Sequence, residues 1–429
     1  MKTIIQPIKG TRDFYPAEMA VRSWLYATAR KVSEAFGYQE YDAPFLESIK
    51  LYAAKSGDEL VNQQSFVFPD RGGDLITLRP ELTPSLARMV AQRQKQLVYP
   101  VRWWSFGPFW RYERPQKGRS REFFQWNIDL FGVDTPEADA ELVAIAGSFL
   151  QEVGLTPKEV KLLVNDRRLM DTQMAALNIP REQRPEVMRW IDRRGKMSLD
   201  EWSTYGKEVG LSDIQLGRLK ELLADNDLWR KSEELVRFFA AIDAMGFNNY
   251  VVFDPNIVRG LDYYTGIVFE AADIKGGVRR SILGGGRYDD LLADVGGDPL
   301  PSVGFAMGDM VISLLLEEYG RLPQELNKPP ASVLVTVFDE NSLLASFTLA
   351  AELRRAGLKV NCYPEAARLG KQFKFADRTG IRLAVILGPD ELKANQVGIK
   401  NLLTGEQCSI QRAKAAQALQ QMLDQPTSP

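Results

Sequence analysis

The densest group of reactive side chains is the basic stretch from Arg111 to Arg121. Five arginine or lysine residues fall within these eleven positions. Guanidinium groups bind phosphate oxygens in pairs and neutralise charge that develops in a transition state. The stretch is therefore a candidate polyphosphate clamp. On charge alone, a solvated surface loop is the more common alternative.

Two further segments combine arginine, tyrosine and glycine. Residues 259–270 read Arg-Gly-Leu-Asp-Tyr-Tyr-Thr-Gly-Ile-Val-Phe-Glu, and residues 283–289 read Leu-Gly-Gly-Gly-Arg-Tyr-Asp. Taken alone, the first segment fits an ordinary β-turn followed by a core strand as well as it fits a ligand-binding site. The glycine triplet of the second favours a tight turn, although glycine also lets a backbone approach a ligand closely.

Composition limits the chemistry that these segments can perform. The chain has no histidine, which removes the commonest general base and metal ligand. Its two cysteines, Cys362 and Cys408, provide neither a disulfide framework nor a metal cluster, and they suit a reducing cytoplasm. Because the net charge is −2, any RNA contact must come from local basic patches. Catalysis must use carboxylates, amides, arginines and groups of the substrate, and we expect no metal-binding residues.

A predicted β-hairpin positions the basic stretch. Residues 101–112 and 122–132 are rich in aromatic and β-branched residues, whereas the residues between them are polar. This pattern is typical of two strands joined by a long loop, so the basic residues lie at the tip. The run 74–79 predicts another strand, which delivers Glu81 and Thr83 just beyond its end.

The remaining elements predict a sheet interrupted by helices. A helix begins at Pro16, a favourable first helical position, and ends at Gly37. Residues 165–239 are charged and helical in pattern, which favours a small helical insertion. A helix also begins near Gly308, and strand character is present at residues 250–253, 267–271 and around 281–283.

The C-terminal part has a different pattern. Prolines between residues 321 and 330 predict a domain linker. Beyond it, the sequence predicts strands at 333–337, 358–362 and 383–387, helices at 344–355 and 371–378, and a hairpin over 397–411. This alternation predicts a small α/β domain with a largely parallel sheet.

The basic stretch carries the first family resemblance. Residues 109–123, Phe-Trp-Arg-Tyr-Glu-Arg-Pro-Gln-Lys-Gly-Arg-Ser-Arg-Glu-Phe, resemble motif 2 of class II aminoacyl-tRNA synthetases, and of the histidyl-tRNA synthetase family in particular. The resemblance implies that Arg111 binds the α-phosphate of ATP and the histidine carboxylate. It also implies that Glu113 accepts a hydrogen bond from the adenine amino group, while Phe123 stacks on the ring. Arg119 and Arg121 are implied as further ATP contacts.

The Arg259 segment resembles a signature of the same family over nearly its whole length, and residues 283–289 follow in the order of the second such motif. The resemblance implies that Arg259 lies across the α-phosphate from Arg111, where other class II enzymes place a metal ion. Two guanidiniums flanking one phosphorus suit in-line attack by the histidine carboxylate, with pyrophosphate leaving. Arg259 and Arg111 are therefore the predicted catalytic residues.

The resemblance also implies a histidine pocket. In it, a carboxylate and a hydroxyl bind the α-ammonium of the substrate. Amide, carboxylate and phenol groups form hydrogen bonds with the imidazole. Such a pocket rejects analogues that leave its polar groups unpaired. The implied base for the transfer step is a phosphate oxygen of the adenylate, so the lack of histidine is no objection. The predicted histidine-binding residues are Glu81, Thr83, Gln125, Asp129, Tyr263 and Tyr264.

Motif 3 departs from the family pattern. Residues 301–308 match its start, but Val311 stands where the family usually has an arginine that holds the γ-phosphate of ATP. Losing such a clamp without compensation costs on the order of 10³-fold in rate. We expect a substitute cation, with Arg279, Arg280 and Arg121 as candidates. Impaired activation is the alternative.

The resemblance covers essentially the whole chain and implies an α+β catalytic core with a class II antiparallel sheet, a helical insertion and a C-terminal α/β anticodon-binding domain. The predicted divisions are 1–165 and 241–325 for the core, 166–240 for the insertion and 331–429 for the anticodon-binding domain. In that last domain Lys371, Lys374 and Arg378 share a helix face that could meet phosphates, with a merely solvated face as the alternative. The surroundings of Pro44 fit the loose, dimer-forming motif 1.

The implied function is ATP-dependent ligation of L-histidine to its tRNA through a histidyl-adenylate, releasing AMP and pyrophosphate. The implied cofactor is ATP with Mg²⁺ bound mainly through the phosphates. We expect a cytoplasmic homodimer with histidine tRNA as its partner and no membrane association. Two alternatives stay open: a silent paralogue such as the regulatory subunit of ATP phosphoribosyltransferase, and a sensor of uncharged tRNA. The first lacks the C-terminal domain and the Arg259 signature, and only Val311 supports the second.

Overall fold

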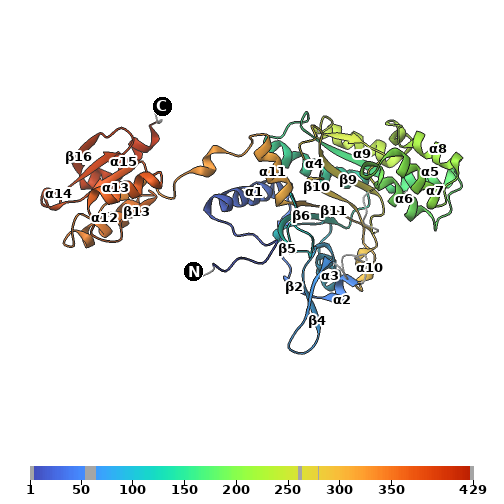
Figure 1. Cartoon of the computed structure of the whole chain (residues 1–429), viewed down its shortest axis with the longest axis horizontal. Helices are drawn as coiled ribbons and strands as arrows, with labels where there is room; N and C mark the ends of the chain where they lie inside the picture. Colours follow the sequence, from blue (N-terminus) through green and yellow to red (C-terminus); the bar gives the residue numbers. More distant parts are fainter. Residues whose placement is uncertain (1–3, 54–63, 259–262, 279, 426–429) are drawn as a thin grey trace. The chain divides into compact units, whose positions relative to one another are not determined.

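The chain forms two compact units, Met1–Pro323 and Gln324–Pro429 (Figure 1). The computed structural model describes residues 4–53, 64–258, 263–278 and 280–425. Each unit encloses a hydrophobic core of its own. Among the helices in these ranges, none combines the length and apolar character needed to cross a bilayer.

An eight-stranded, mostly antiparallel sheet organises the first unit. Only the outer pairs β1–β5 and β7–β8 are parallel. The predicted hairpin is confirmed, because its two strands pair in continuous register and leave residues 111–121 as the connecting loop. In spatial order the strands are β1 (Gln39–Glu40), β5 (Val101–Trp110), β6 (Glu122–Phe131), β11 (Ser302–Gly308), β10 (Leu283–Arg287), β9 (Ile267–Asp273), β7 (Val160–Asp166) and β8 (Val251–Phe253).

The glycine triplet lies within strand β10 and does not form a turn. The sequence predicts a strand around 281–283, but the strand runs from Leu283 to Arg287. Close packing of backbones explains the difference: a Cβ on Gly285 would stand 2.1 Å from the carbonyl oxygen of Gly304 on the neighbouring strand. The glycines therefore serve close approach within the sheet.

Three helices pack against the large sheet: α1 (Pro16–Ala35), α4 (Pro136–Glu152) and α11 (Asp309–Glu318). Trp126 of β6 lies at the centre of this packing, with ring centroids 5.1 Å from Phe149 of α4 and 5.0 Å from Phe305 of β11. Its indole N–H donates to Ser33 Oγ of α1 at 3.1 Å, so the buried polar atom is satisfied. The predicted first helix starts at Pro16 as expected and ends two residues before Gly37, which adopts a φ of 79°.

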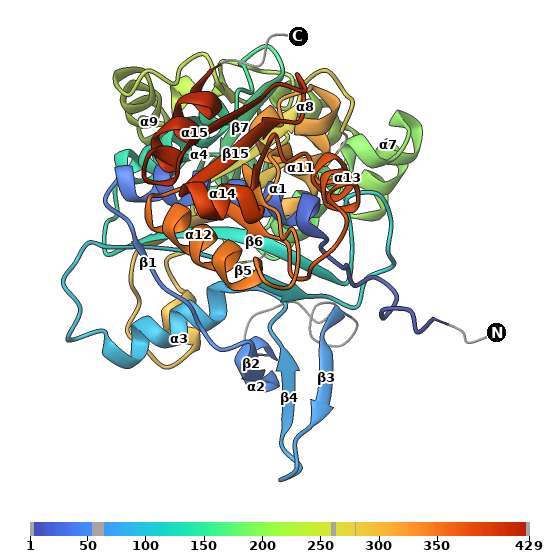
Figure 2. The same cartoon turned by 90° about the vertical axis from the view of Figure 1, so that its left-hand side faces the viewer.

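A small three-stranded sheet extends away from the large one, as Figures 1 and 2 both show. It contains β2 (Leu46–Ser48), β4 (Leu75–Leu78) and β3 (Phe66–Pro69), with β4 in the middle. Short helices accompany it: α2 (Ile49–Ala53), α3 (Thr83–Arg93) and α10 (Leu291–Asp294). Several apolar side chains on and beside this sheet are exposed, namely Phe45, Leu46, Val67, Phe68 and Leu75.

A helical segment separates β7 from β8 and is gathered at one end of the unit in Figure 1. Two tryptophans organise it: the rings of Trp190 and Trp202 stack 4.1 Å apart, and each indole N–H donates to the other residue's carbonyl oxygen. Capping boxes at Ser198 and Ser212 start two of its helices. The elements are α5 (Arg167–Ala176), α6 (Arg184–Asp192), η2 (Arg194–Lys196), α7 (Leu199–Glu208), α8 (Asp213–Leu222), η3 (Leu228–Lys231) and α9 (Glu233–Ala244).

The second unit is an α/β domain with a five-stranded sheet of order β13-β12-β14-β15-β16. The first three strands are parallel, and the predicted hairpin adds the last two in antiparallel orientation. The strands are β12 (Val333–Val335), β13 (Val360–Cys362), β14 (Leu383–Ile386), β15 (Gln396–Asn401) and β16 (Gln407–Gln411). The helices are η4 (Gln324–Asn327), α12 (Leu343–Arg355), α13 (Leu369–Arg378), α14 (Pro389–Ala394), η5 (Arg412–Lys414) and α15 (Ala415–Asp424).

Candidate active site

A large cleft opens over the middle of the eight-stranded sheet, with a volume of about 1280 Å³. The hairpin loop, strands β6, β10 and β11, and residues 191–199 of the helical segment contribute to its lining. Of the predicted ATP and histidine contacts, five side chains line this cleft: Arg111, Glu113, Arg119, Phe123 and Gln125.

Arg111 is braced at the start of the hairpin loop. Its Nε donates to the carbonyl oxygen of Pro80 at 2.9 Å, and its guanidinium carbon lies 5.4 Å from the centre of the Phe123 ring. Pro80 immediately precedes Glu81, so this hydrogen bond joins the two predicted substrate-binding segments. One face of the guanidinium is thereby fixed, which pre-organises the side chain for an anion in the cleft.

In the rest of the loop, some charged side chains line the cleft and others stabilise the loop itself. Arg119 forms an ion pair with Glu113, with 2.9 Å between Nε and Oε2. Gly118 permits the turn between them because its φ is 76°. Arg121 is absent from the cleft lining. Its guanidinium lies 4.0 Å from the centre of the Tyr112 ring, and its Nε donates to the Glu113 carbonyl oxygen at 3.3 Å.

Asp129 lies four positions beyond Gln125 on the same face of β6, in a buried cluster of tyrosines. The Tyr288 hydroxyl donates to Asp129 Oδ1. Burial raises the pKa of Asp129 to about 7, against the lowering effect of this hydrogen bond. Burial, followed by the charge of Asp129, also raises the pKa values of Tyr288 and Tyr41.

Aromatic contacts connect this cluster to the Arg259 signature. The Tyr263 ring is 6.0 Å from Tyr288 in an edge-on arrangement and 4.9 Å from Tyr264. The buried Tyr41 hydroxyl has no hydrogen-bond partner in the ranges that the structure describes. Tyr41 and Tyr288 were not among the predicted site residues, although Tyr288 lies within the second family motif. Arg259, the other predicted catalytic residue, lies outside the described residues.

Glu81 and Thr83 lie at the junction of β4 and α3, where Glu81 is buried and Thr83 begins the helix. Arg79, which sequence reasoning did not single out, holds this junction. It is fully buried, and its guanidinium donates to Asp42 Oδ1 at 2.7 Å, to the Ala43 carbonyl at 2.8 Å and to the Pro108 carbonyl at 3.0 Å. Arg79 therefore ties the Glu81 segment to strand β5.

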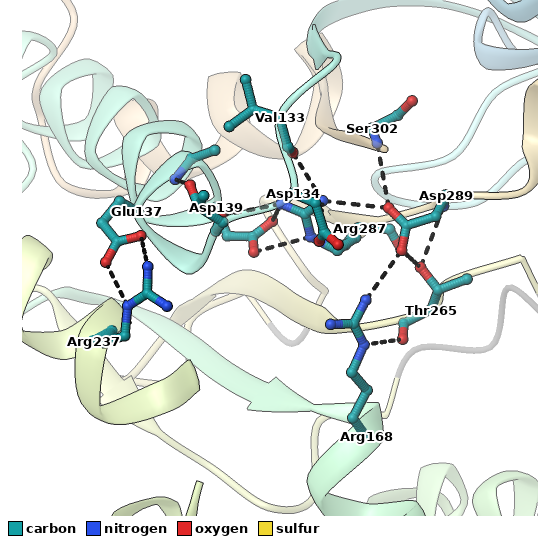
Figure 3. A network of polar contacts seen from close by, with 12 residues as sticks. Val133, Asp134, Glu137, Asp139, Arg168, Arg237, Thr265, Arg287, Asp289 and Ser302 are labelled. Atoms are coloured by element: carbon teal, nitrogen blue, oxygen red, sulfur yellow. Dashed lines mark hydrogen bonds and ion pairs between the residues drawn. The ribbon is translucent and has the colours of Figure 1, made fainter. Parts of the chain in front are cut away.

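Arg287 is the centre of a second buried network, drawn in Figure 3. Its Nη2 lies 3.0 Å from Asp139 Oδ1 and its Nη1 lies 3.3 Å from Asp289 Oδ1. Asp289 in turn accepts from Thr265 Oγ1 at 2.7 Å and from Arg168 Nη2 at 3.1 Å (Figure 3). Because Thr265 follows Tyr264 and Arg287 precedes Tyr288, the network fixes both tyrosine-bearing segments to helices α4 and α5.

Val311 lies in the first turn of α11 and lines the cleft. Nearby, Asp309 accepts from the Phe124 backbone N–H at 2.9 Å and from Arg12 at 2.7 Å. These bonds occupy Asp309 in holding α11 and the N-terminal segment to β6. The part of the chain that the structure describes has no group of three or more acidic or thiol side chains arranged to hold a metal ion.

A mostly antiparallel sheet with a basic hairpin loop at the edge of a cleft is the arrangement expected of the catalytic unit of a class II aminoacyl-tRNA synthetase. Residues 10–310 match the family model for histidyl-tRNA synthetase, and residues 332–422 match the model for an anticodon-binding domain. The chain belongs to the histidyl-tRNA synthetase family, and the predicted fold class is confirmed.

Relatives match along nearly the full length. The histidine–tRNA ligase of Opitutus terrae is 38% identical over 423 residues, covering 95% of this chain and 96% of the relative. The chloroplastic/mitochondrial histidine–tRNA ligase of Arabidopsis thaliana is 38% identical, covering 95% of this chain and 85% of the relative. The crystal structure of histidyl-tRNA synthetase from Nostoc sp. PCC 7120 has a TM-score of 0.82 at 26% identity, with 98% of this chain and 100% of that chain covered.

Proposed function

We propose that this protein ligates L-histidine to its tRNA in two steps at the cleft. A histidine carboxylate oxygen first attacks the α-phosphorus of ATP, the bond to the bridging oxygen breaks, and pyrophosphate leaves. A ribose hydroxyl at the tRNA 3′ end then attacks the adenylate carbonyl, and AMP leaves. The observation that carries this proposal is Arg111, held at the cleft wall by the residue that precedes Glu81.

At the nucleotide end, Phe123 stacks on adenine and Glu113 accepts from its amino group. The ion pair with Arg119 supports this role, because it holds the Glu113 carboxylate at the cleft wall. Arg111 binds the α-phosphate and neutralises charge that develops there, which is worth about 10²- to 10³-fold in rate for a well-placed donor. We place Arg259 on the opposite side of the phosphorus, as the family signature implies.

At the amino-acid end, Asp129 and Gln125 face the imidazole from one side of β6, and the tyrosine pair Tyr263–Tyr264 closes the pocket. Glu81 and Thr83 bind the α-ammonium. Since Tyr288 already donates to Asp129, the carboxylate is oriented before substrate arrives. The chain has no histidine to act as a base. A phosphate oxygen of the adenylate therefore takes the proton of the attacking ribose hydroxyl.

The cofactor of activation is ATP, with Mg²⁺ as its counter-ion. Several carboxylates that line the cleft already have partners: Asp309 accepts from Arg12 and the Phe124 backbone, Glu113 is paired with Arg119, and Asp192 is paired with Lys196. This arrangement favours a cation held mainly through the triphosphate. When bound, the ion would neutralise phosphate charge during activation.

We also propose that the protein acts as a homodimer through the small sheet. Phe45, Leu46, Val67, Phe68 and Leu75 present apolar area to solvent there. Exposed apolar side chains gathered on one small sheet favour an interaction site, and the surroundings of Pro44 fit the dimer-forming motif.

The C-terminal unit is proposed to bind the tRNA anticodon through helix α13. Lys371, Lys374 and Arg378 are exposed on it, whereas Gln372 and Ala376 face inward. Lys371 is paired with Glu365 at 2.7 Å, so the other two cations carry more of the proposed phosphate contact. The proposal retains the predicted divisions 1–165, 166–240, 241–325 and 331–429, and a cytoplasmic location.

The test is aminoacylation by the purified full chain with histidine, ATP, Mg²⁺ and histidine tRNA. We expect charging with histidine and with none of the other amino acids. Arg111→Ala lowers the rate by about 10²-fold or more, whereas Arg218→Ala, an exposed α8 residue paired with Glu221, leaves it unchanged. A folded protein that binds histidine or tRNA without charging it would contradict the proposal and favour a regulatory or sensing paralogue.

A further inference from the structure

The phosphate-binding end of the cleft has an apolar residue where the resemblance places a cation. Val311 lines the cleft at the first turn of α11, directly after strand β11. A triphosphate bound there carries several negative charges that a valine cannot neutralise. If activation proceeds, another basic side chain must reach this end of the cleft.

The basic residues that line the cleft differ in whether other residues of the chain already bind them. Arg111 donates to Pro80 and Arg119 is paired with Glu113. In the wall formed by the helical segment, Arg194 donates to Asn256 and Lys196 is paired with Asp192. Among the described cations of the lining, Arg280 makes no hydrogen bond or ion pair with any described residue.

Strand pairing brings Arg280 next to Val311. In the antiparallel pair β10–β11, Leu283 lies opposite Met307. Arg280 precedes the start of β10 by three residues, and Val311 follows the end of β11 by three, so the two lie beyond neighbouring strand ends. The side-chain positions agree: a Cβ on Gly118 would stand 3.3 Å from Arg280 Cδ and 3.7 Å from Val311 Cγ2. Arg280 and Val311 therefore flank the same glycine at the tip of the hairpin loop.

The charges around Arg280 also suit an anion. Burial, and then the neighbouring Arg119, lower the pKa of Arg280, while Glu113 raises it. Arginine remains protonated at neutral pH despite such a shift. The Arg280 guanidinium is thus charged, half-buried and close to the Arg119 guanidinium. A phosphate bound between these two cations would offset their mutual repulsion. The other two candidates fit less well, since Arg121 does not line the cleft and Arg279 lies outside the described residues.

We propose that Arg280 binds the terminal phosphates of ATP and takes the role that Val311 cannot fill. The inference rests on the proposed activation of histidine by ATP. As the carboxylate–phosphorus bond forms and the bond to the bridging oxygen breaks, negative charge moves onto pyrophosphate. Arg280 stabilises that charge from the β10 side of the cleft, opposite the loop that carries Arg119.

The experiment compares Arg280→Ala with the unmodified chain in histidine-dependent ATP–pyrophosphate exchange. By analogy with other phosphate-binding arginines, kcat/KM for ATP falls on the order of 10³-fold, while KM for histidine stays near its original value. Arg280→Lys retains the charge and loses less. In the Arg280→Ala background, Val311→Arg restores a large part of the rate, because it returns a guanidinium to the same place. Arg218→Ala, which removes one partner of the exposed Arg218–Glu221 ion pair, serves as the control.

A second readout separates phosphate binding from a structural role. Pyrophosphate has left before transfer, so single-turnover transfer from preformed adenylate to tRNA is unchanged in Arg280→Ala. If exchange is retained, if exchange and transfer fall equally, or if Val311→Arg restores nothing, Arg280 does not bind the leaving phosphates and the inference is wrong. Failure of the unmodified chain to exchange would instead overturn the proposed function, and the inference with it.

Discussion

A substitution at Gly304 tests the proposed histidine pocket. Gly304 lies directly opposite Asp129 in the β6–β11 pairing, and the Asp129 side chain lies over it. A Cβ added to Gly304 would stand 2.0 Å from Asp129 Oδ1, 2.7 Å from its Cγ and 2.8 Å from the Ile128 carbonyl oxygen. Real carbon–oxygen contacts do not approach this closely, so Gly304→Ala must move either the Asp129 carboxylate or the strand.

The size of the effect follows from the contact. Overpacking a buried site by one methyl group costs roughly 1–3 kcal/mol of folding free energy. Relieving a 2.0 Å contact requires a displacement on the order of 1 Å, and a misplacement of that size costs about 10²-fold in rate at a pre-organised site. We therefore expect kcat/KM for histidine to fall about 10²-fold, with a smaller change for ATP.

The assay is ATP–pyrophosphate exchange at varied histidine, together with thermal unfolding. Gly308→Ala on the same strand provides the stability control, because a Cβ there meets nothing within 4 Å. If Gly304→Ala binds and activates histidine as the unmodified chain does, Asp129 is not the residue that faces the imidazole.

Three further predictions concern stability and assembly. Arg287→Met leaves the buried Asp139 carboxylate without its partner and lowers the unfolding free energy by about 3–5 kcal/mol; denaturant unfolding should show this, and adding Asp139→Leu should recover most of the loss. The pKa of Asp129 in the folded protein, about 7, lies above the ordinary 3.8. The contribution of protonated Asp129 to the free energy of unfolding is therefore complete below pH 3.8 and is lost as pH rises through 7. Thermal unfolding without substrate should therefore show a stability decline from about pH 5 to pH 7 that is shallower in Asp129→Asn; an unchanged slope would count against the raised pKa. Leu75→Lys on the small sheet should raise the dimer dissociation constant about tenfold or more in sedimentation experiments, whereas Ile214→Lys, which replaces a still more exposed apolar residue on α8, should not.

Local sequence patterns were enough to predict the two strands that carry the proposed ATP-binding loop. The abundance of aromatic and β-branched residues in the two segments predicts the β5–β6 hairpin, and the polar residues between them predict the loop. The strand–helix alternation after residue 331 likewise predicts the C-terminal sheet. These features depend on periodicity over a few residues, which a single sequence displays directly.

Long-range burial was not predictable in the same way. Arg79 and Arg287 are among the most buried side chains, although arginine is usually exposed. Their partners are distant in sequence, as with Asp139, 148 positions before Arg287. The same reason explains why Tyr41 was not predicted beside Asp129. It also explains why only the folded structure, in which Arg280 and Val311 flank Gly118, distinguishes Arg280 from Arg121 as a neighbour of Val311.

Histidine-dependent ATP–pyrophosphate exchange by the purified chain, with the other amino acids as controls, tests the proposed activation of histidine. We expect exchange with histidine alone, which requires a cation in the place of the missing motif 3 arginine. Absence of exchange in a folded protein that still binds histidine or tRNA would contradict this proposal, and would identify the chain as a family member that binds without catalysing activation.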